Sequence, residues 1–323
     1  MNLQPRINYG AQFAILLGFT GAAFVIAGIG MILTVTLVFH VDMNNASTFL
    51  LKPENATKAQ WLNTGFSFIA FFVPTIATAA IASNKPFAYT NFNTKINWKQ
   101  VVLVIVLVFF GMMLSGTLGA LTEKIPLSPQ LLKKAKALED TYDEAVAAMA
   151  TMKNFQQYLI ALIVIALAPA IFEETLFRGG LQKILTGWTK NAWVSIIITA
   201  ILFSLVHFSY FGFLSRFALG MLLGFVFYYS GNIWLNILLH FLNNAAAVTQ
   251  LYFLLKSGKP IDKAMNDNLP GMSSNTWILL LMTTVVIGII IFLFKRFKEE
   301  TALVNPTATD IAPVINNNPF ANE

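Results

Sequence analysis

The side chains of this sequence with the clearest chemical potential are ionisable groups inside long apolar stretches. Glu173 and Glu174 are adjacent in one such stretch, and His207 and His240 lie in two later ones. A charged side chain at the centre of a bilayer costs about 2.5–3.5 kcal/mol or more, so its retention there indicates a function. A carboxylate beside two imidazoles can activate water, because the carboxylate accepts a proton and an imidazole can share or relay it.

Helical spacing sorts these groups. Glu173 and Glu174 are about 100° apart around a helix axis, so we expect them to face different neighbours. Arg178 follows Glu174 by four residues, which predicts an ion pair on one face, while Glu173 has no partner on its own helix. The pair could serve only to neutralise and orient the helix, and a direct chemical role for Glu174 is an equal alternative.

Two further side chains extend the pattern. Asn244 follows His240 by four residues, so the two could donate together to an oxyanion, where one donor is typically worth about 2.7–4 kcal/mol. Phe203 precedes His207 by one helical turn and should pack against it. A structural role is open for each histidine, since an intramembrane imidazole can simply join helices by a hydrogen bond.

The reaction class that fits this set is amide hydrolysis. The sequence contains neither an HExxH helix nor a GxSxG elbow, so the common zinc-protease and serine-hydrolase templates do not apply. Glu173, His207 and His240 could alternatively bind a divalent, zinc-like metal ion, because carboxylate and imidazole are suitable ligands.

The elements that must position these residues are membrane helices. Of the 323 residues, 56% are hydrophobic and 11% are charged, against about 25% charged in soluble domains. A span needs about 20 apolar residues, and the long runs lack the alternation of barrel strands, so we expect an all-α, polytopic integral membrane helix bundle with about eight transmembrane helices. The predicted spans are roughly 13–39, 65–83, 101–121, 158–185, 192–210, 213–229, 233–255 and 277–294. Pro169 should kink or open the fourth helix just before the two glutamates.

The chain divides by composition into five parts. We expect transmembrane helices 1–3 in residues 1–125, an amphipathic or extramembrane helical connection in 126–154, helices 4–7 with the ionisable groups in 155–255, a loop and an eighth helix in 256–298, and a disordered tail in 299–323. The absence of cysteine excludes disulfides and thiolate chemistry. The lysines form no basic stripe, so a net charge of +6 does not indicate a nucleic-acid partner.

Three motifs carry a family resemblance. Residues 173–178 read EExxxR, residues 203–207 read FxxxH and residues 240–244 read HxxxN. In this order they resemble the CPBP family of intramembrane proteases, which includes the CAAX prenyl endopeptidases and the bacterial Abi group. The resemblance covers roughly residues 155–255 and implies that they form the catalytic core.

The resemblance implies that Glu173 with His207 activates the hydrolytic water and that His240 with Asn244 supports the oxyanion, with Glu174, Arg178 and Phe203 in support. It implies a multi-pass protein of the cell membrane and a membrane-associated peptide or protein substrate. Both a metal-dependent and a metal-free reaction are described for the family, and the sequence leaves the choice open.

Two other functions remain open. Buried glutamates and histidines also form proton relays, so a proton-coupled transporter is one alternative, although we find no repeat-related pair of broken helices. A non-catalytic scaffold of the same family is the other, and the presence of every motif residue weakens it. Oligomeric state is not indicated.

Overall fold

The computed structural model describes residues 5–92, 95–258 and 274–304, and every regular element within these ranges is helical. The α-helices are α1 (Tyr9–Val38), α2 (Ala46–Leu51), α3 (Ala56–Ser67), α4 (Val73–Ala82), α5 (Pro86–Tyr89), α6 (Trp98–Thr122), α7 (Pro129–Met149), α8 (Phe155–Ala161), α9 (Ala168–Glu174), α10 (Lys183–Thr189), α11 (Ala192–Leu205), α12 (Phe213–Ser230), α13 (Ile233–Lys256) and α15 (Ser274–Val304). Short 3-10 turns are η1 (Met43–Asn45) and η2 (Pro53–Asn55), and π-helical segments are η3 (Phe68–Phe72), η4 (Leu162–Leu167) and η5 (Thr175–Gln182). The predicted all-α class is confirmed.

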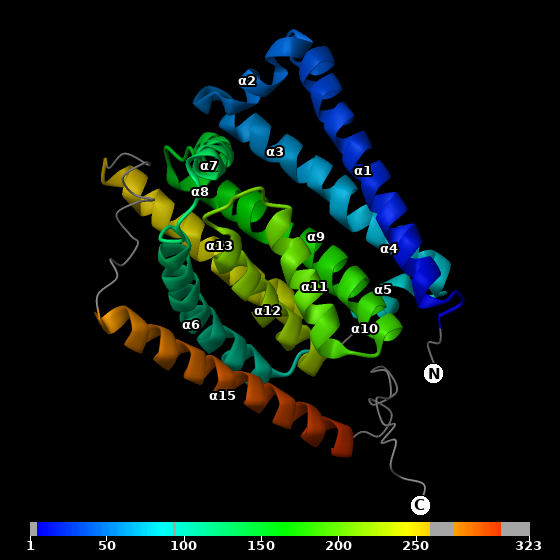
Figure 1. Ribbon diagram of the computed structural model, residues 1–323. Helices are drawn as coiled ribbons and strands as arrows, with labels where there is room; N and C mark the ends of the chain where they lie inside the picture. Colours follow the sequence, from blue (N-terminus) through cyan, green and yellow to red (C-terminus); the bar gives the residue numbers. More distant parts are fainter. Residues whose placement is uncertain (1–4, 93–94, 259–273, 305–323) are drawn as a thin grey trace, which may run out of the picture.

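Seven helical stretches in the described part of the chain are long and apolar enough to cross a membrane. They are Tyr9–Val38, Pro53–Ala82, Trp98–Thr122, Phe155–Thr189, Phe213–Ser230, Ile233–Lys256 and Trp277–Phe297. The remaining predicted span, 192–210, is shorter than expected, because α11 ends at Leu205. In Figure 1, α1 and α15 lie at opposite edges of the bundle, with α9 to α13 between them.

The outer faces of the bundle are apolar. Leu37 on α1, Phe109 on α6 and Leu281 on α15 are 68%, 62% and 66% exposed. Large apolar side chains this exposed, on several helices, form a surface suited to lipid rather than to water. Exposure and helix length together support an integral membrane protein.

Two of the long stretches open into a π-helical segment just before a proline. η3 precedes Pro74 and η4 precedes Pro169. Proline has no N–H and its ring crowds the carbonyl four residues earlier, so a regular α-helical bond cannot form there. The opening predicted at Pro169 is therefore present, one turn before Glu173. The third π-helical segment, η5, follows Glu174 directly and contains no proline.

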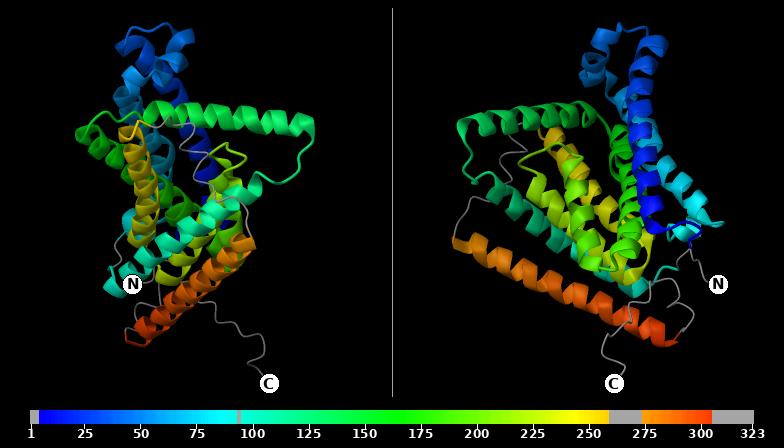
Figure 2. Two further views of the ribbon diagram at one scale, coloured as in Figure 1. Left: turned by 90° about the vertical axis from the view of Figure 1, so that its left-hand side faces the viewer. Right: turned by 45° about the vertical axis from the view of Figure 1, so that its right-hand side comes forward.

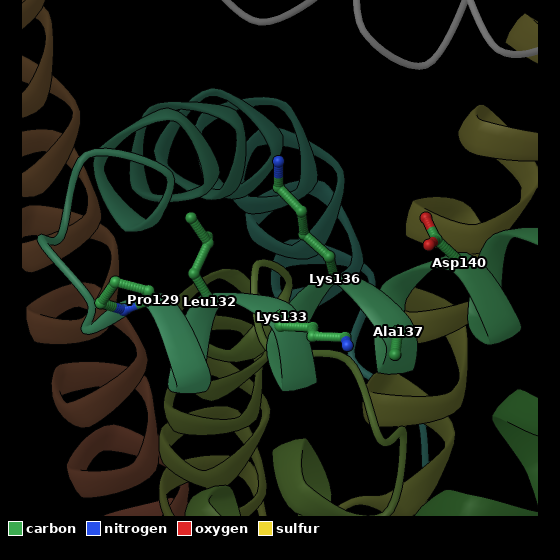
Figure 3. Close-up of a pocket in the computed structure, with 6 residues that line it drawn as sticks. All are labelled: Pro129, Leu132, Lys133, Lys136, Ala137 and Asp140. Carbon is green, nitrogen blue, oxygen red and sulfur yellow. The ribbon is translucent and has the colours of Figure 1, made fainter.

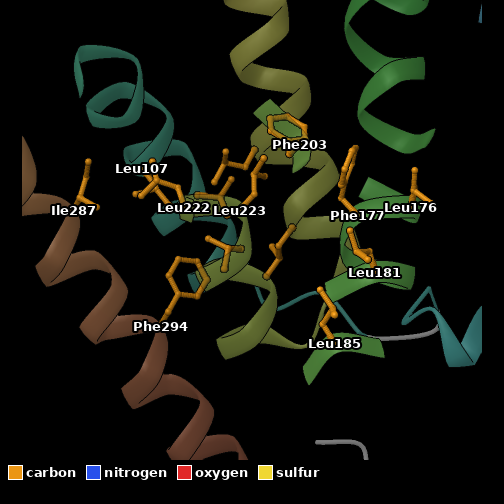
Figure 4. Packing of buried hydrophobic residues seen from close by; sticks show 14 of the residues in the cluster. Leu107, Leu176, Phe177, Leu181, Leu185, Phe203, Leu222, Leu223, Ile287 and Phe294 are labelled. Atoms are coloured by element: carbon orange, nitrogen blue, oxygen red, sulfur yellow. The ribbon is translucent and has the colours of Figure 1, made fainter. Parts of the chain in front are cut away.

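The largest apolar core lies between α6, η5, α11, α12, α13 and α15 (Figure 4). Phe177, Phe203 and Leu223 are at most 2% exposed within it, and Leu107 and Phe294 close it on the α6 and α15 side. α6 packs on α12, α13 and α15. This core fixes the helices that carry the polar site described below.

α7 lies within residues 126–154, where a helical connection was expected. It runs crosswise to α13 (Figure 2) and begins at Pro129, after the N-cap residue Ser128, whose side chain accepts a hydrogen bond from the amide of Leu131. One face of α7 lines an open depression (Figure 3). The lining residues are Pro129, Leu132, Lys133, Lys136, Ala137 and Asp140.

The C-terminal part differs from the expectation at one point. The disordered tail was predicted to start at residue 299, but α15 continues to Val304. The rest of that predicted tail, 305–323, and residues 259–273 of the predicted loop lie outside the described residues.

Candidate active site

The centre of the polar site is a completely buried ion pair. Arg178 Nη1 donates to Glu174 Oε1 at 2.9 Å, and both side chains are 0% exposed. Arg178 Nη2 donates to the carbonyl of Gly220 at 3.0 Å, and its guanidinium lies 4.8 Å from the centre of the Phe203 ring. The pair predicted from the four-residue spacing is confirmed.

Gly220 makes this arrangement possible from the side of α12. A Cβ atom at this position would lie 3.0 Å from both Cα and Cβ of Ala200 on α11, closer than side chains normally pack. The absence of a side chain therefore allows α12 to approach α11 closely and exposes its carbonyl to Arg178. Gln182, one turn after Arg178, makes the equivalent bond to the carbonyl of Gly224 at 2.9 Å.

Glu174 also holds His240. His240 Nδ1 lies 2.9 Å from Glu174 Oε1. Because a carboxylate can only accept, Nδ1 must carry the proton, which leaves Nε2 as the acceptor in the neutral ring. Glu174 therefore fixes both the orientation and the tautomer of His240.

Glu173 approaches the same imidazole from its other nitrogen. Its Oε2 lies 3.9 Å from His240 Nε2, and this oxygen is buried with no hydrogen-bond partner. The two glutamates therefore share one neighbour, because the imidazole from α13 reaches between them, whereas Arg178 and Asn236 lie only at Glu174. The difference between the two carboxylates lies in their counter-charge: Glu174 has Arg178, and Glu173 has no such pair.

His207 was predicted to lie within a helix, but it lies outside one. α11 ends at Leu205, and His207 is in the turn that follows, where its amide bonds to the carbonyl of Ser204 at 3.3 Å. Its Nδ1 donates to the carbonyl of Phe203 at 2.8 Å, so its Nε2 is also an acceptor in the neutral ring. Burial lowers the pKa of His207, while the nearby Glu173 acts in the opposite direction.

Phe203 packs against both imidazoles. Its ring meets His207 edge-to-face at 5.2 Å, as predicted, and meets His240 at 5.6 Å. It is 1% exposed. It therefore forms an apolar wall that holds both rings and covers the Arg178 guanidinium.

Phe203→Ala is expected to lower the free energy of unfolding by about 3–5 kcal/mol, because it leaves a cavity in the core and removes a cation–π contact. Turnover of any substrate should fall as well, since both imidazoles lose a packing surface. Thermal unfolding in detergent measures the first effect. Phe203→Leu, which keeps most of the volume, is the control. Equal unfolding temperatures of Phe203→Ala and the wild type would contradict the packing role given to Phe203.

Asn244 and His240 are not joined by a hydrogen bond in the described part of the chain. The side chain of Asn244 contacts Asn243, whose Nδ2 lies 3.4 Å from Asn244 Oδ1. Asn236, one turn before His240, is in contact with the site instead. Its Nδ2 donates to the carbonyl of Leu223 at 2.7 Å and lies 3.4 Å from Glu174 Oε2.

Sequence reasoning missed Asn236, although a signal was present. Asn236, His240 and Asn244 recur at intervals of four along α13, which places neighbouring members of the set on one face. Asn236 is 0% exposed, so a polar residue at that position needs partners.

The metal-site alternative requires Glu173, His207 and His240 to converge on one point. Among the described residues, no group of three or more His, Asp or Glu side chains is placed to hold a metal ion. As arranged, the three side chains do not fit a three-ligand site.

Apolar helices around a buried set of carboxylates and imidazoles define a polytopic, all-α membrane protein with a polar site in its interior. Residues 155–246 match the family model described as Type II CAAX prenyl endopeptidase Rce1-like. The match contains all seven predicted site residues, and it confirms the resemblance to the CPBP/CAAX protease family. No match was found among curated proteins or among solved structures.

Proposed function

We propose that this protein is an intramembrane endopeptidase of the CAAX type, in which Glu173 activates the water that attacks a peptide bond. The observation that carries the proposal is the unequal environment of two adjacent glutamates. Glu174 is neutralised by Arg178, whereas Oε2 of Glu173 is buried without a hydrogen-bond partner. A carboxylate oxygen that no hydrogen-bond donor or fixed counter-charge holds is available to accept a proton from water.

In the proposed reaction, Glu173 removes a proton from water while the water oxygen bonds to the carbonyl carbon of the substrate. His207 presents Nε2 as a second acceptor for the same water, because its Nδ1 is held by Phe203. The proton on Glu173 then passes to the amide nitrogen as the C–N bond breaks. The products are a carboxylic acid and an amine, and Glu173 is again a carboxylate.

His240 and Asn244 are proposed to stabilise the oxyanion. His240 Nε2 can donate only when the ring is doubly protonated, because Nδ1–H is directed to Glu174. In the reactive state the ring carries a second proton taken up from solvent, and the Glu174 carboxylate remains its counter-charge while the negative charge of Glu173 passes to the oxyanion. Asn244 follows one turn later on α13 and would supply an amide donor once substrate is bound.

We further propose a membrane-associated peptide or protein as the substrate and the cell membrane as the location. The matched family is named for prenylated CAAX proteins, so a prenylated peptide is the first substrate to examine. The apolar outer faces of the bundle support a substrate that arrives through the lipid. A divalent metal ion would require Glu173, His207 and His240 to move together from their present arrangement, and metal analysis of the purified protein measures directly whether one binds.

The test compares membranes from cells that express the wild type with membranes from cells that express Glu173→Ala. We expect peptide fragments in the first sample that are missing from the second, and the purified wild type should release them from synthetic peptides. If Glu173→Ala and His207→Ala were both folded and cleaved the peptides as well as the wild type does, the proposal would be refuted. Peptide-independent, pH-driven solute flux in liposomes would favour a transporter.

A further inference from the structure

We propose that Glu139 is a positioning residue for His207: from α7 it holds the loop that carries this imidazole in place. The loop comprises residues 206–212, between α11 and α12, and is called the His207 loop below. The catalytic half of this proposal depends on the proposed function. Glu139 lies outside the three motifs and outside the matched segment.

The Glu139 carboxylate accepts hydrogen bonds from two residues of the His207 loop. Ser209 Oγ lies 2.9 Å from Oε1 and 3.0 Å from Oε2, and the amide of Phe211 donates to Oε2 at 3.2 Å. Ser209 is 5% exposed, and its Oγ also accepts from the amide of Gly212 at 3.0 Å. Bonds to an ionised carboxylate are about twice as strong as neutral ones, so this contact is a substantial restraint on the loop.

A second contact on the same face of α7 holds the start of α12. Tyr142 is three residues after Glu139, and the guanidinium carbon of Arg216 lies 4.6 Å from the centre of its ring. Arg216 is in the first turn of α12 and is close enough to act electrostatically on His207. α7 therefore contacts the chain at two places, through Glu139 on the His207 loop and through Tyr142 on the first turn of α12.

The His207 loop needs a restraint of this kind. Phe208, directly after His207, has φ +51°, a conformation that non-glycine residues rarely adopt, and its side chain is 73% exposed. The base of the loop is closed by a bond from Ser204 Oγ to the carbonyl of Phe213 at 2.7 Å, and short turn bonds such as that from the Phe208 amide to the carbonyl of Leu205 shape its ends. Strained backbone persists only when its surroundings hold it, and here Glu139 supplies the contacts from outside the loop.

The position of His207 decides whether its Nε2 can reach the water on Glu173. A displacement of about 1 Å in a catalytic group can lower the rate by about 10²-fold. The helical connection of residues 129–149, which looks peripheral in sequence, is thereby part of the catalytic apparatus. Its role is to orient a base that lies 68 residues further along the chain.

The test uses the full-length protein with Glu139→Gln and Glu139→Ala, and with Glu144→Gln as the matched control. Glu144 is on the same helix and is exposed, and its replacement makes the same change in charge. Three quantities are measured: kcat and KM for a cleaved peptide, hydrogen exchange of residues 206–212, and the unfolding temperature. Exchange reports on the loop directly, since the Phe211 amide is one of the bonded groups.

We expect Glu139→Ala to lower kcat by about 10- to 100-fold with KM little changed, and to speed exchange in the His207 loop. Glu139→Gln, which keeps one acceptor oxygen, should have a smaller effect, and Glu144→Gln should match the wild type. In a Ser209→Ala background the Glu139 substitutions should cost less, because the shared bond is already lost.

Unchanged loop exchange in Glu139→Ala would overturn the proposal whatever the activity. Faster exchange with unchanged kcat would overturn the catalytic half. If the wild type cleaves no peptide, the proposed function has failed, and the exchange result alone then decides whether Glu139 holds the loop.

Discussion

Glu173→Gln is expected to lower peptide hydrolysis by about 10²–10⁴-fold and to leave the fold intact, because it removes the proposed general base without removing a structural bond. Oε2 of Glu173 has no hydrogen-bond partner, and His240 Nε2 lies 3.9 Å away. An amide of nearly the same shape should therefore be accommodated. The measurement is kcat/KM on a membrane peptide, together with thermal unfolding of both proteins.

Glu173→Asp distinguishes the effect of the carboxylate charge from the effect of the carboxylate position. It keeps a carboxylate but withdraws it by one methylene, so activity should fall less than with Gln and by an amount that reflects geometry. Glu174→Gln makes the same chemical change one residue later and should mainly affect stability. Full activity of Glu173→Gln, or equal losses of stability in Glu173→Gln and Glu174→Gln, would contradict the division of roles.

The membrane architecture could be predicted because its determinants are local. Runs of apolar residues give the spans, and Pro169 gives the opening of the helix before Glu173. The end of α11 could not be predicted in the same way, since Val206 and His207 continue the apolar run and the helix stops through turn bonds and the positive φ of Phe208. The extension of α15 beyond residue 299 was likewise missed, since the apolar run ends at Phe294 while the helix continues through charged residues to Val304.

The contacts of the site were likewise predictable where they are local and not where they join different helices. Contacts within one helical turn, such as Glu174–Arg178 and Phe203–His207, follow from four-residue spacing. Contacts between helices do not, because they depend on how the helices pack. His240 reaches Glu174 and not Asn244, and Glu139 reaches a loop that no spacing rule connects to it.

Arg178→Met is expected to lower the free energy of unfolding by about 3–5 kcal/mol, because it leaves the Glu174 carboxylate buried without its counter-charge. Both side chains are 0% exposed, so water cannot solvate the remaining group. The guanidinium also bonds to Gly220 and covers Phe203, and methionine replaces the packing but neither bond. Thermal unfolding in detergent measures the loss.

The double variant Glu174→Gln with Arg178→Met distinguishes a charge effect from a packing effect. Removing both partners of a buried pair is often close to neutral, so the double variant should recover most of the stability lost in Arg178→Met. Gln at position 174 can still accept from His240 Nδ1, which keeps the tautomer that presents Nε2. If the double variant were as unstable as Arg178→Met, packing rather than charge would explain the role of Arg178. If it recovered both stability and turnover, Glu174 would act only by orienting His240 and not through its charge.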